Sequence, residues 1–429
     1  MVFIMNKFYF KLLIVAICLS QSFIFQTKAA PDTLSVTAGN LKTVLGINKD
    51  FISNLALKGE INGNDIATIR SMARLCTLSL KNVDIVEGGS FTVYETPISV
   101  TRNVVPANMF TRMSNLISVD LPQKAVSLGD NAFYFCAGLI SVNLGDSIKS
   151  IGDGAFSACG ELSFISLPTH LTSLGTSAFM TCSSLKSITL PESLTTIGET
   201  AFWSCKELKA IAIPGNVTSI GKDAFCGCSS MTSISIANGL PSIGEGAFRA
   251  CPVTSVTIPN SVKTIGKRAF ADCTSLTKMI LGSGVTTIED YAFDACSALN
   301  EIHCKALIPP TGIYGFSNVQ ENTCKLYVPK GTVTSYKNAF LWAGFANTIE
   351  ESSSTPVSPV QSSNLEVHTE QDNIVLSGVE PGEMVSVYTE AGTLLQKIKA
   401  TDHTVRIKAS ALPHFYILKT THKTLKMIL

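Results

Sequence analysis

Charge is scarce in this chain: only 15% of its 429 residues are Asp, Glu, Lys or Arg, and 33 basic residues offset 32 acidic ones. No basic run or acidic tail is present, so the composition offers no electrostatic basis for binding nucleic acid or an anionic membrane surface. Histidine is also rare, and none of the six His residues has the spacing of a metal site or a catalytic triad. Nucleophile-elbow, zinc-protease and phosphate-loop motifs are missing as well. We therefore expect no catalytic residue, no metal ligand and no cofactor.

The first thirty residues have the order of a targeting segment. Lys7 and Lys11 are followed by an apolar run from Leu12 to Leu19, and the small residues Ala29 and Ala30 come after it. This order predicts a secretory signal peptide at residues 1–30, and an uncleaved membrane anchor is the alternative. The protein is then expected to be secreted or displayed on the cell surface.

An internal repeat dominates the rest of the chain. An Ala-Phe pair recurs eight times, with Met109-Phe110 preceding in phase, and the Phe positions advance by 23 residues at every step except one of 22. A Cys follows each of the last eight Phe by three residues; these are Cys136, Cys159, Cys182, Cys205, Cys228, Cys251, Cys273 and Cys296. A unit of this length cannot bury an apolar side by itself, so neighbouring units must stack into a continuous core.

Each repeat contains the signals for one coil of a solenoid. The Ile211-x-Ile213 stretch alternates as a half-buried strand does, and Pro214 ends it because proline has no N–H to donate. Gly198 is expected to permit a tight bend, and the Ala-Phe pair is expected to fill the interior. The fold predicted is mostly β, with about nine coils whose parallel sheet is on the order of 40 Å long.

The cysteine column is interpreted as a buried ladder of free thiols. Equivalent side chains in stacked coils point the same way, which disfavours disulfide geometry, and Cys packs well as a small apolar residue. Disulfides or a metal within the column are the alternatives. Cys226 lies outside the column and is expected to be half exposed, while Cys304 and Cys324 are a candidate disulfide pair near the end of the repeats.

The repeat Ala-Phe-x-x-Cys-x-x-Leu-x-x-Ile-x-Leu-Pro resembles the unit of the BspA-like leucine-rich-repeat surface proteins of Bacteroidetes, over about residues 105 to 305. Residues 55–66 and 78–80 are similar to the N-terminal cap of that family. Residues 308–310, 326–331 and 336–342 are similar to its C-terminal cap. The resemblance implies a leucine-rich-repeat solenoid on the cell surface, adhesion to host matrix proteins or other cells in some members, and no catalytic residues.

The domain organisation follows from these boundaries. We expect an N-terminal cap region with an insertion at 31–108, repeats at 109–305, a C-terminal cap at 306–350, a Ser/Pro-rich linker at 351–364 and a small β-sandwich at 365–429. The last part resembles the sorting domain of the type IX secretion system at residues 385–392 and 412–419. It departs from that pattern at His414-Phe415 and in lacking a terminal basic residue.

Outward positions of the repeated strand form the candidate ligand face. They are small, mostly hydroxylated and nearly uncharged in the middle of the array, with one aromatic anchor; the candidates are Phe164, Ser166, Ser187, Thr189, Ser233, Ser235, Ser255 and Thr257. Ser and Thr also suit an exposed sheet without any ligand. The insertion at 81–108, with Phe91 and Tyr94, is an equal rival.

The function predicted is a non-catalytic binding or adhesion scaffold for a protein or glycan ligand, with host matrix among the candidates. A structural spacer without a ligand is one alternative. A secreted hydrolase is another, and His303 on the last strand is the residue that would have to serve it.

Overall fold

The computed structural model describes residues 33–351 and, in the C-terminal part, residues 366–370, 373–377, 379, 384–389, 394–401, 404–408, 415–419 and 424–428. The chain divides into two compact units, Met1–Glu351 and Ser352–Leu429. The expected signal peptide, nearly all of the expected linker, and residues 390–392 and 412–414 of the sorting-domain pattern lie outside the described residues.

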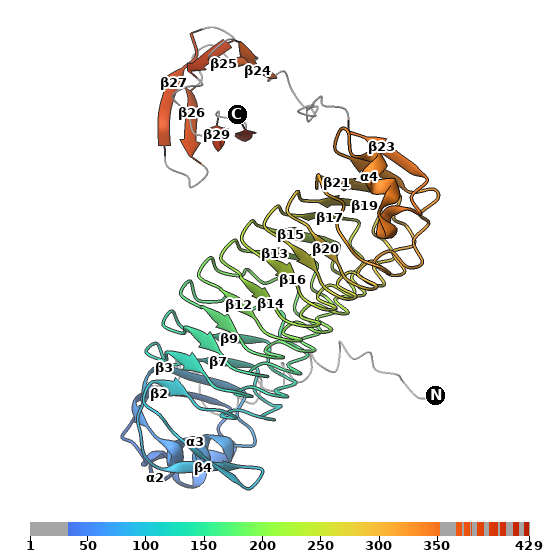
Figure 1. The fold of residues 1–429 in the computed structure, drawn as a ribbon. Helices are drawn as coiled ribbons and strands as arrows, with labels where there is room; N and C mark the ends of the chain where they lie inside the picture. Colours follow the sequence, from blue (N-terminus) through green and yellow to red (C-terminus); the bar gives the residue numbers. More distant parts are fainter. Residues whose placement is uncertain are drawn as a thin grey trace, which may run out of the picture. The chain divides into compact units, whose positions relative to one another are not determined.

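The first unit is a solenoid in which each repeat forms one coil (Figure 1). One side, here called the long-strand face, carries parallel strands that end before the repeated proline, as β13 ends at Ile213 and β17 at Ile258. Its strands are β1 (Leu34–Val36), β2 (Asn54–Ile61), β3 (Thr77–Ile85), β7 (Ser118–Asp120), β9 (Ser141–Asn143), β13 (Ala210–Ile213), β15 (Ser233–Ile236), β17 (Ser255–Ile258), β19 (Lys278–Leu281), β21 (Glu301–Cys304), β22 (Lys325–Val328) and β23 (Asn347–Glu350). The predicted parallel β-solenoid is confirmed.

A second column of two-residue strands runs along the coils and is here called the short-strand face. It forms two parallel sheets, β6-β8-β10-β11-β12-β14 and β16-β18-β20. The strands are β6 (Val104–Val105), β8 (Ser127–Leu128), β10 (Ser150–Ile151), β11 (Ser173–Leu174), β12 (Thr196–Ile197), β14 (Ser219–Ile220), β16 (Ser242–Ile243), β18 (Thr264–Ile265) and β20 (Thr287–Ile288).

The long-strand face is not the single sheet expected from the sequence. It consists of three sheets, β1-β2-β3-β7-β9, β13-β15 and β17-β19-β21-β22-β23. No strand is assigned where the coils carrying Phe164 and Ser187 cross this face. The backbone hydrogen bond between these coils is long, with 3.3 Å from Lys186 N to Ser163 O. The corresponding bond between coils that carry assigned strands is 2.8 Å, from Ile140 N to Ile117 O. The other break, between β15 and β17, falls at the 22-residue step, where Pro252 lacks an N–H.

Stacked phenylalanines fill the interior. Consecutive rings from Phe110 to Phe316 lie 4.7–5.4 Å apart between centroids and nearly parallel. The cysteine column runs beside them, fully buried and free. Each of its thiols donates to the carbonyl of a Phe in the preceding coil, as Cys205 Sγ does to Phe179 O at 3.2 Å. Ring stacking and thiol–carbonyl bonds therefore tie every coil to the next.

Glycine recurs at the same position of successive repeats for a different reason from the tight bend that was expected. Gly198 keeps a φ outside the left-handed region, and a Cβ there would lie 2.4 Å from the backbone of Gly175 in the preceding coil. The left-handed residue is Thr200 (φ 50°), two positions later. Glycine is needed at this point because the coils approach each other closely.

Caps close both ends of the solenoid and continue its sheet. The N-terminal cap contains α2 (Leu41–Leu45), the 3-10 helix η1 (Gly46–Phe51), α3 (Gly63–Arg70) and a hairpin of β4 (Ser90–Val93) and β5 (Thr96–Ser99). The C-terminal cap contains α4 (Val333–Asn338) and the 3-10 helix η2 (Phe340–Trp342). Trp342 covers the last ring of the stack, 5.2 Å from Phe316, and donates its Nε1–H to Pro310 O at 2.8 Å.

The expected pairing of Cys304 with Cys324 does not occur, since both thiols are buried and free. Cys304 ends β21, whereas Cys324 comes before β22, whose Lys325 pairs with Glu301. The two cysteines are thus about four residues apart along neighbouring strands, roughly 13 Å, which exceeds the reach of a disulfide. Tyr336 Oη donates instead to Cys304 Sγ at 3.1 Å.

The second unit contains two antiparallel sheets, β24-β25-β28 and β27-β26-β29-β30. Its strands are β24 (Glu366–Glu370), β25 (Asn373–Ser377), β26 (Met384–Thr389), β27 (Leu394–Lys399), β28 (Thr404–Lys408), β29 (Phe415–Lys419) and β30 (Thr424–Ile428). Ile374 and Ile407 of the first sheet share one buried cluster with Val385 and Val387 of the second. This is the packing of a small sandwich, the fold expected for residues 365–429.

Candidate functional site

The predicted ligand residues lie on the outward side of the long-strand face. Alternation along each strand buries one side chain and exposes the next, as in β17, where Val256 is buried between Ser255 and Thr257. All eight are exposed: Phe164, Ser166, Ser187, Thr189, Ser233, Ser235, Ser255 and Thr257. Phe164 is 61% exposed. The remaining outward positions between Phe164 and Thr257 are Ala210 and Ala212 of β13, which pair with Ser233 and Ser235. None of the outward positions in this stretch is therefore charged.

The rival surface on the 81–108 insertion is only partly present. Phe91 is not available for a ligand, since it is 2% exposed and packs inward from β4 together with Val93. Tyr94 follows at the turn of the hairpin and is 62% exposed. The alternation of the hairpin strand therefore decides which aromatic reaches solvent.

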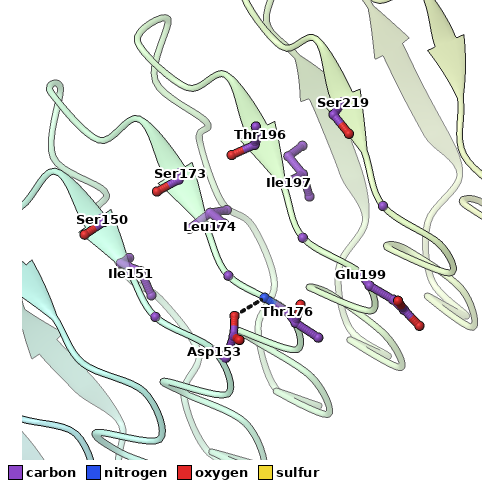
Figure 2. A pocket seen from close by; sticks show the side chains of 14 residues that line it. Ser150, Ile151, Asp153, Ser173, Leu174, Thr176, Thr196, Ile197, Glu199 and Ser219 are labelled. Atoms are coloured by element: carbon purple, nitrogen blue, oxygen red, sulfur yellow. Dashed lines mark hydrogen bonds between the residues drawn. The ribbon is translucent and has the colours of Figure 1, made fainter.

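A groove that was not predicted runs along the short-strand face. It is open, has a volume of about 500 Å³, and crosses the coils of β10, β11, β12 and β14. Figure 2 shows its row of hydroxyl groups on successive coils, from Ser150, Ser173, Thr196 and Ser219. Within residues 33–351 these hydroxyls have no hydrogen-bond partner. The signal for this row was the Ser or Thr that precedes each Ile-Gly or Leu-Gly of the repeat.

Acidic side chains at the edge of this groove are engaged in structure. Asp153 Oδ1 accepts the N–H of Thr176 at 2.7 Å (Figure 2), and Asp130 Oδ1 accepts that of Asp153 at 2.9 Å. These two carboxylates therefore bridge consecutive coils. In the described part of the chain, no three His, Cys, Asp or Glu side chains gather as a metal site.

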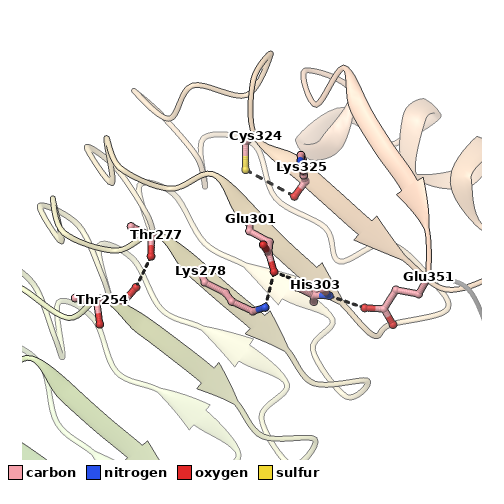
Figure 3. A network of polar contacts seen from close by, with 8 residues as sticks. All are labelled: Thr254, Thr277, Lys278, Glu301, His303, Cys324, Lys325 and Glu351. Carbon is pink, nitrogen blue, oxygen red and sulfur yellow. Dashed lines mark hydrogen bonds and ion pairs between the residues drawn. The ribbon is translucent and has the colours of Figure 1, made fainter. Parts of the chain in front are cut away.

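His303 belongs to a polar network at the end of the long-strand face (Figure 3). Its Nδ1 lies 2.7 Å from Glu351 Oε1 and its Nε2 lies 2.6 Å from Glu301 Oε1. Lys278 also donates to Glu301, and the His303 ring stacks on Tyr327 with centroids 4.5 Å apart. Each ring nitrogen of His303 is therefore within hydrogen-bonding distance of a carboxylate oxygen. This His303 is a structural link between coils, with no free nitrogen to serve as a general base.

Removing the central carboxylate of this network should measure its strength. The Lys278 ammonium and, secondarily, His303 hold the pKa of Glu301 below its usual range. We expect Glu301→Gln to lower the free energy of unfolding by about 1 kcal/mol at pH 7. The stabilisation is present above the ordinary glutamate pKa of about 4.3, and it is lost as the pH falls through the lower folded-state value. Urea unfolding at pH 7 and pH 3 would check this, with exposed Glu192→Gln as the control; equal effects of the two variants at pH 7 would contradict it.

The thiols are poor nucleophiles. Burial raises the pKa of Cys136 and of Cys205 to about 12. Cys226, expected to be half exposed, is 4% exposed because Arg249 covers it and donates from Nε to its Sγ at 3.4 Å. The cysteines of the described solenoid therefore stabilise packing.

Comparison with known proteins agrees with this architecture. The family model of the BspA type leucine-rich repeat region matches residues 103–232 and 218–344, in six copies. Among curated proteins no match was found. No described helix is long and apolar enough to cross a membrane.

Solved structures of repeat proteins are similar to this chain. A leucine-rich-repeat protein from Bacteroides ovatus is 20% identical, with a TM-score of 0.36, and the match covers 65% of this chain and 92% of that one. The T. pallidum leucine-rich-repeat protein is 30% identical over 43% of this chain and 78% of its own, with a TM-score of 0.32. A leucine-rich cell surface protein from Faecalibacterium prausnitzii is 20% identical over 65% and 88%, with a TM-score of 0.28. With its family model matched across most of the solenoid, the chain belongs to the BspA-type leucine-rich-repeat family.

Proposed function

We propose that this protein is a non-catalytic scaffold, secreted or displayed at the cell surface, that binds a protein or glycan ligand on its long-strand face. The observation that carries the proposal is the combination of an exposed phenylalanine, Phe164, with rows of exposed Ser and Thr and no charge across the middle of that face. A repeat array suits this role because stacking coils builds an extended surface from small units.

The chemistry of the face favours an extended polar ligand with an apolar group. Hydroxyl groups both donate and accept, so they match the peptide groups of a polypeptide or the hydroxyls of a sugar. An aromatic side chain in a polar surround is the kind of residue that contributes most to binding energy. Charged residues are scarce on this face, so the interaction should depend little on salt.

Binding of the full chain to immobilised matrix proteins and glycans tests the proposal. We expect saturable binding to at least one of them, weakened at least tenfold when Phe164→Ala is combined with Ser187→Glu. The first change removes the apolar anchor, and the second places a charge in the uncharged face. Phe340→Ala is the matched control, because that ring is 76% exposed but lies on η2 in the C-terminal cap.

Two results would count against the proposal. If the double variant bound as tightly as the unaltered protein, the ligand would lie elsewhere. If the unaltered protein bound nothing on the panel, the role in matrix adhesion would be wrong and the spacer interpretation would be favoured.

A further inference from the structure

An arginine is held between two exposed aromatic rings near the N-terminal end of the solenoid. The guanidinium carbon of Arg112 lies 5.3 Å from the ring centroid of Tyr94 and 5.8 Å from that of Phe135. Tyr94 comes from the turn between β4 and β5, and the other two residues come from the left-handed corners of successive coils. We call Tyr94, Arg112 and Phe135 the Arg112 cluster.

No acid of the described solenoid pairs with this arginine. Within residues 33–351, the Arg112 guanidinium forms neither a salt bridge nor a hydrogen bond, although Glu95 follows Tyr94 directly. A second cation, Arg70, lies over the ring of Phe91 in the same hairpin, 5.8 Å from its centroid, and donates to the backbone carbonyls of Asn108 and Met109 at 2.8 and 3.0 Å. The cluster is therefore a positively charged site in a chain whose charges otherwise nearly balance.

The rings of the cluster are open to solvent. Tyr94 is 62% exposed and Phe135 is 49% exposed. The corner that follows Phe135 along the solenoid is Ala158, since Phe135 N donates to Ser157 O of that coil. That corner bears only a methyl group, so the next coil places no ring beside Phe135 at this position. Ring contacts also restrict the Arg112 side chain, so less rotamer entropy remains to be lost when its donors bind a ligand.

This arrangement selects for a particular ligand chemistry. A guanidinium that lies between ring faces directs its N–H donors outward in its own plane, where they match the two oxygens of a carboxylate. The guanidinium covers part of each ring, and the remaining exposed surface of Tyr94 and Phe135 suits the apolar C–H face of a sugar ring. A sugar that carries its own carboxylate, a uronic acid, satisfies both requirements within a single residue. An acidic peptide satisfies only the charge, because its carboxylates stand on flexible side chains.

We propose that the Arg112 cluster is a binding site for carboxylate-bearing glycans, with the guanidinium pairing the uronate carboxylate and Tyr94 and Phe135 packing against the sugar ring. The site lies apart from the long-strand face and does not depend on it. The protein would then have two binding surfaces, and the Arg112 cluster would distinguish acidic glycans from neutral ones by their charge.

Polysaccharide binding by the full chain tests this site. The probes are polygalacturonate, alginate and hyaluronan, each beside its carboxyl-reduced form, with polyglutamate and dextran sulfate as polyanions that are not uronates. We expect at least one uronate polymer to bind and its carboxyl-reduced form to lose binding at least tenfold. Uronate binding should weaken at least tenfold in Arg112→Gln and also in the double variant Tyr94→Ala with Phe135→Ala. Arg112→Lys should retain only part of the binding, because an ammonium cannot pair bidentately with a carboxylate.

Arg268→Gln is the matched control, because Arg268 lies over one ring, that of Tyr291 at 5.6 Å, and has no second ring among the described residues. An unchanged thermal transition in Arg112→Gln would show that the fold is intact. Equal uronate binding by Arg112→Gln and the unaltered protein, or no binding to any of the three uronate polymers, would overturn the proposal. Polyglutamate or dextran sulfate binding as tightly, and with the same dependence on Arg112, would also overturn it in favour of a general anion site. The double variant Phe164→Ala with Ser187→Glu, which tests the long-strand face, should bind uronate polymers as tightly as the unaltered protein. Failure of one proposal can therefore be distinguished from failure of the other.

Discussion

Replacing Phe202 with alanine is expected to lower the free energy of unfolding by about 3–5 kcal/mol, the usual cost of emptying a core position of this size. Phe202 is fully buried, and its ring centroid lies 5.3 Å from that of Phe179 and 5.1 Å from that of Phe225. The substitution removes one ring from the middle of the stack and leaves a cavity that the coils on either side cannot close without breaking their thiol–carbonyl and backbone bonds.

The same change should also reduce cooperativity. Coils of a solenoid contact only their neighbours, so the two halves communicate through the interface that Phe202 fills. Urea unfolding should therefore show a lower midpoint and a broader or biphasic transition. Phe164→Ala is the control, because its ring is exposed and its loss should cost no more than about 0.5 kcal/mol. A loss below 1 kcal/mol in Phe202→Ala would mean that the stack contributes little to stability.

The second large effect is a steep loss of stability at alkaline pH. Burial raises the pKa of the Cys136 and Cys205 thiols to about 12, whereas a cysteine in an unfolded chain ionises near pH 8.5. Between these values the unfolded state releases protons that the folded state retains, so each such thiol destabilises the fold by about 1.4 kcal/mol per pH unit. The contribution is fully present below about pH 8.5 and is lost as the pH rises toward the folded-state value.

A single substitution isolates this effect from other alkaline titrations. Cys205→Ser keeps a donor for the carbonyl of Phe179 but does not ionise in this range. We expect the free energy of unfolding, measured under reducing conditions from about pH 8.5 to 11, to fall less steeply with pH in the variant. The difference in slope should be about 1.4 kcal/mol per pH unit, which corresponds to the one proton that the Cys205 thiol releases on unfolding. If the two proteins had the same slope, the Cys205 thiol would ionise as readily in the folded state as in the unfolded state, and the prediction would be wrong.

Much of the solenoid could be predicted from the repeat, because a fixed phase assigns the same environment to every copy. The positions of Phe202 and Cys205 predicted burial, and alternation around Ile211 predicted which neighbours face solvent. The break in the long-strand face could not be predicted this way. It depends on backbone separations of a few tenths of an ångström near Phe164, to which side-chain periodicity is insensitive.

Candidate sites were predicted less completely. The eight ligand-face residues are exposed as their phase required, but their binding of a ligand remains a prediction. Phe91 was misjudged because an irregular insertion has no repeat to assign its inward and outward sides. The hydroxyl groove was not predicted, although the Ser or Thr before each Ile-Gly or Leu-Gly was visible in the sequence. Candidate ligand surfaces were sought only on the outward positions of the longer strand and on the insertion.

By itself, the sequence determined the coil, its interior of Phe and Cys, the class of fold and the family, since these follow from periodicity and from the need of each unit to bury an apolar side against the next. Only the tertiary structure decided which residues from different periods meet. It separated Cys304 from Cys324 by about four residues along adjacent strands, and it brought Tyr94 of the hairpin against Arg112 and Phe135. The physical reason is that a repeat specifies the direction of a side chain within its own coil, whereas contacts with caps and insertions depend on where the backbone leaves that repeat and returns to it.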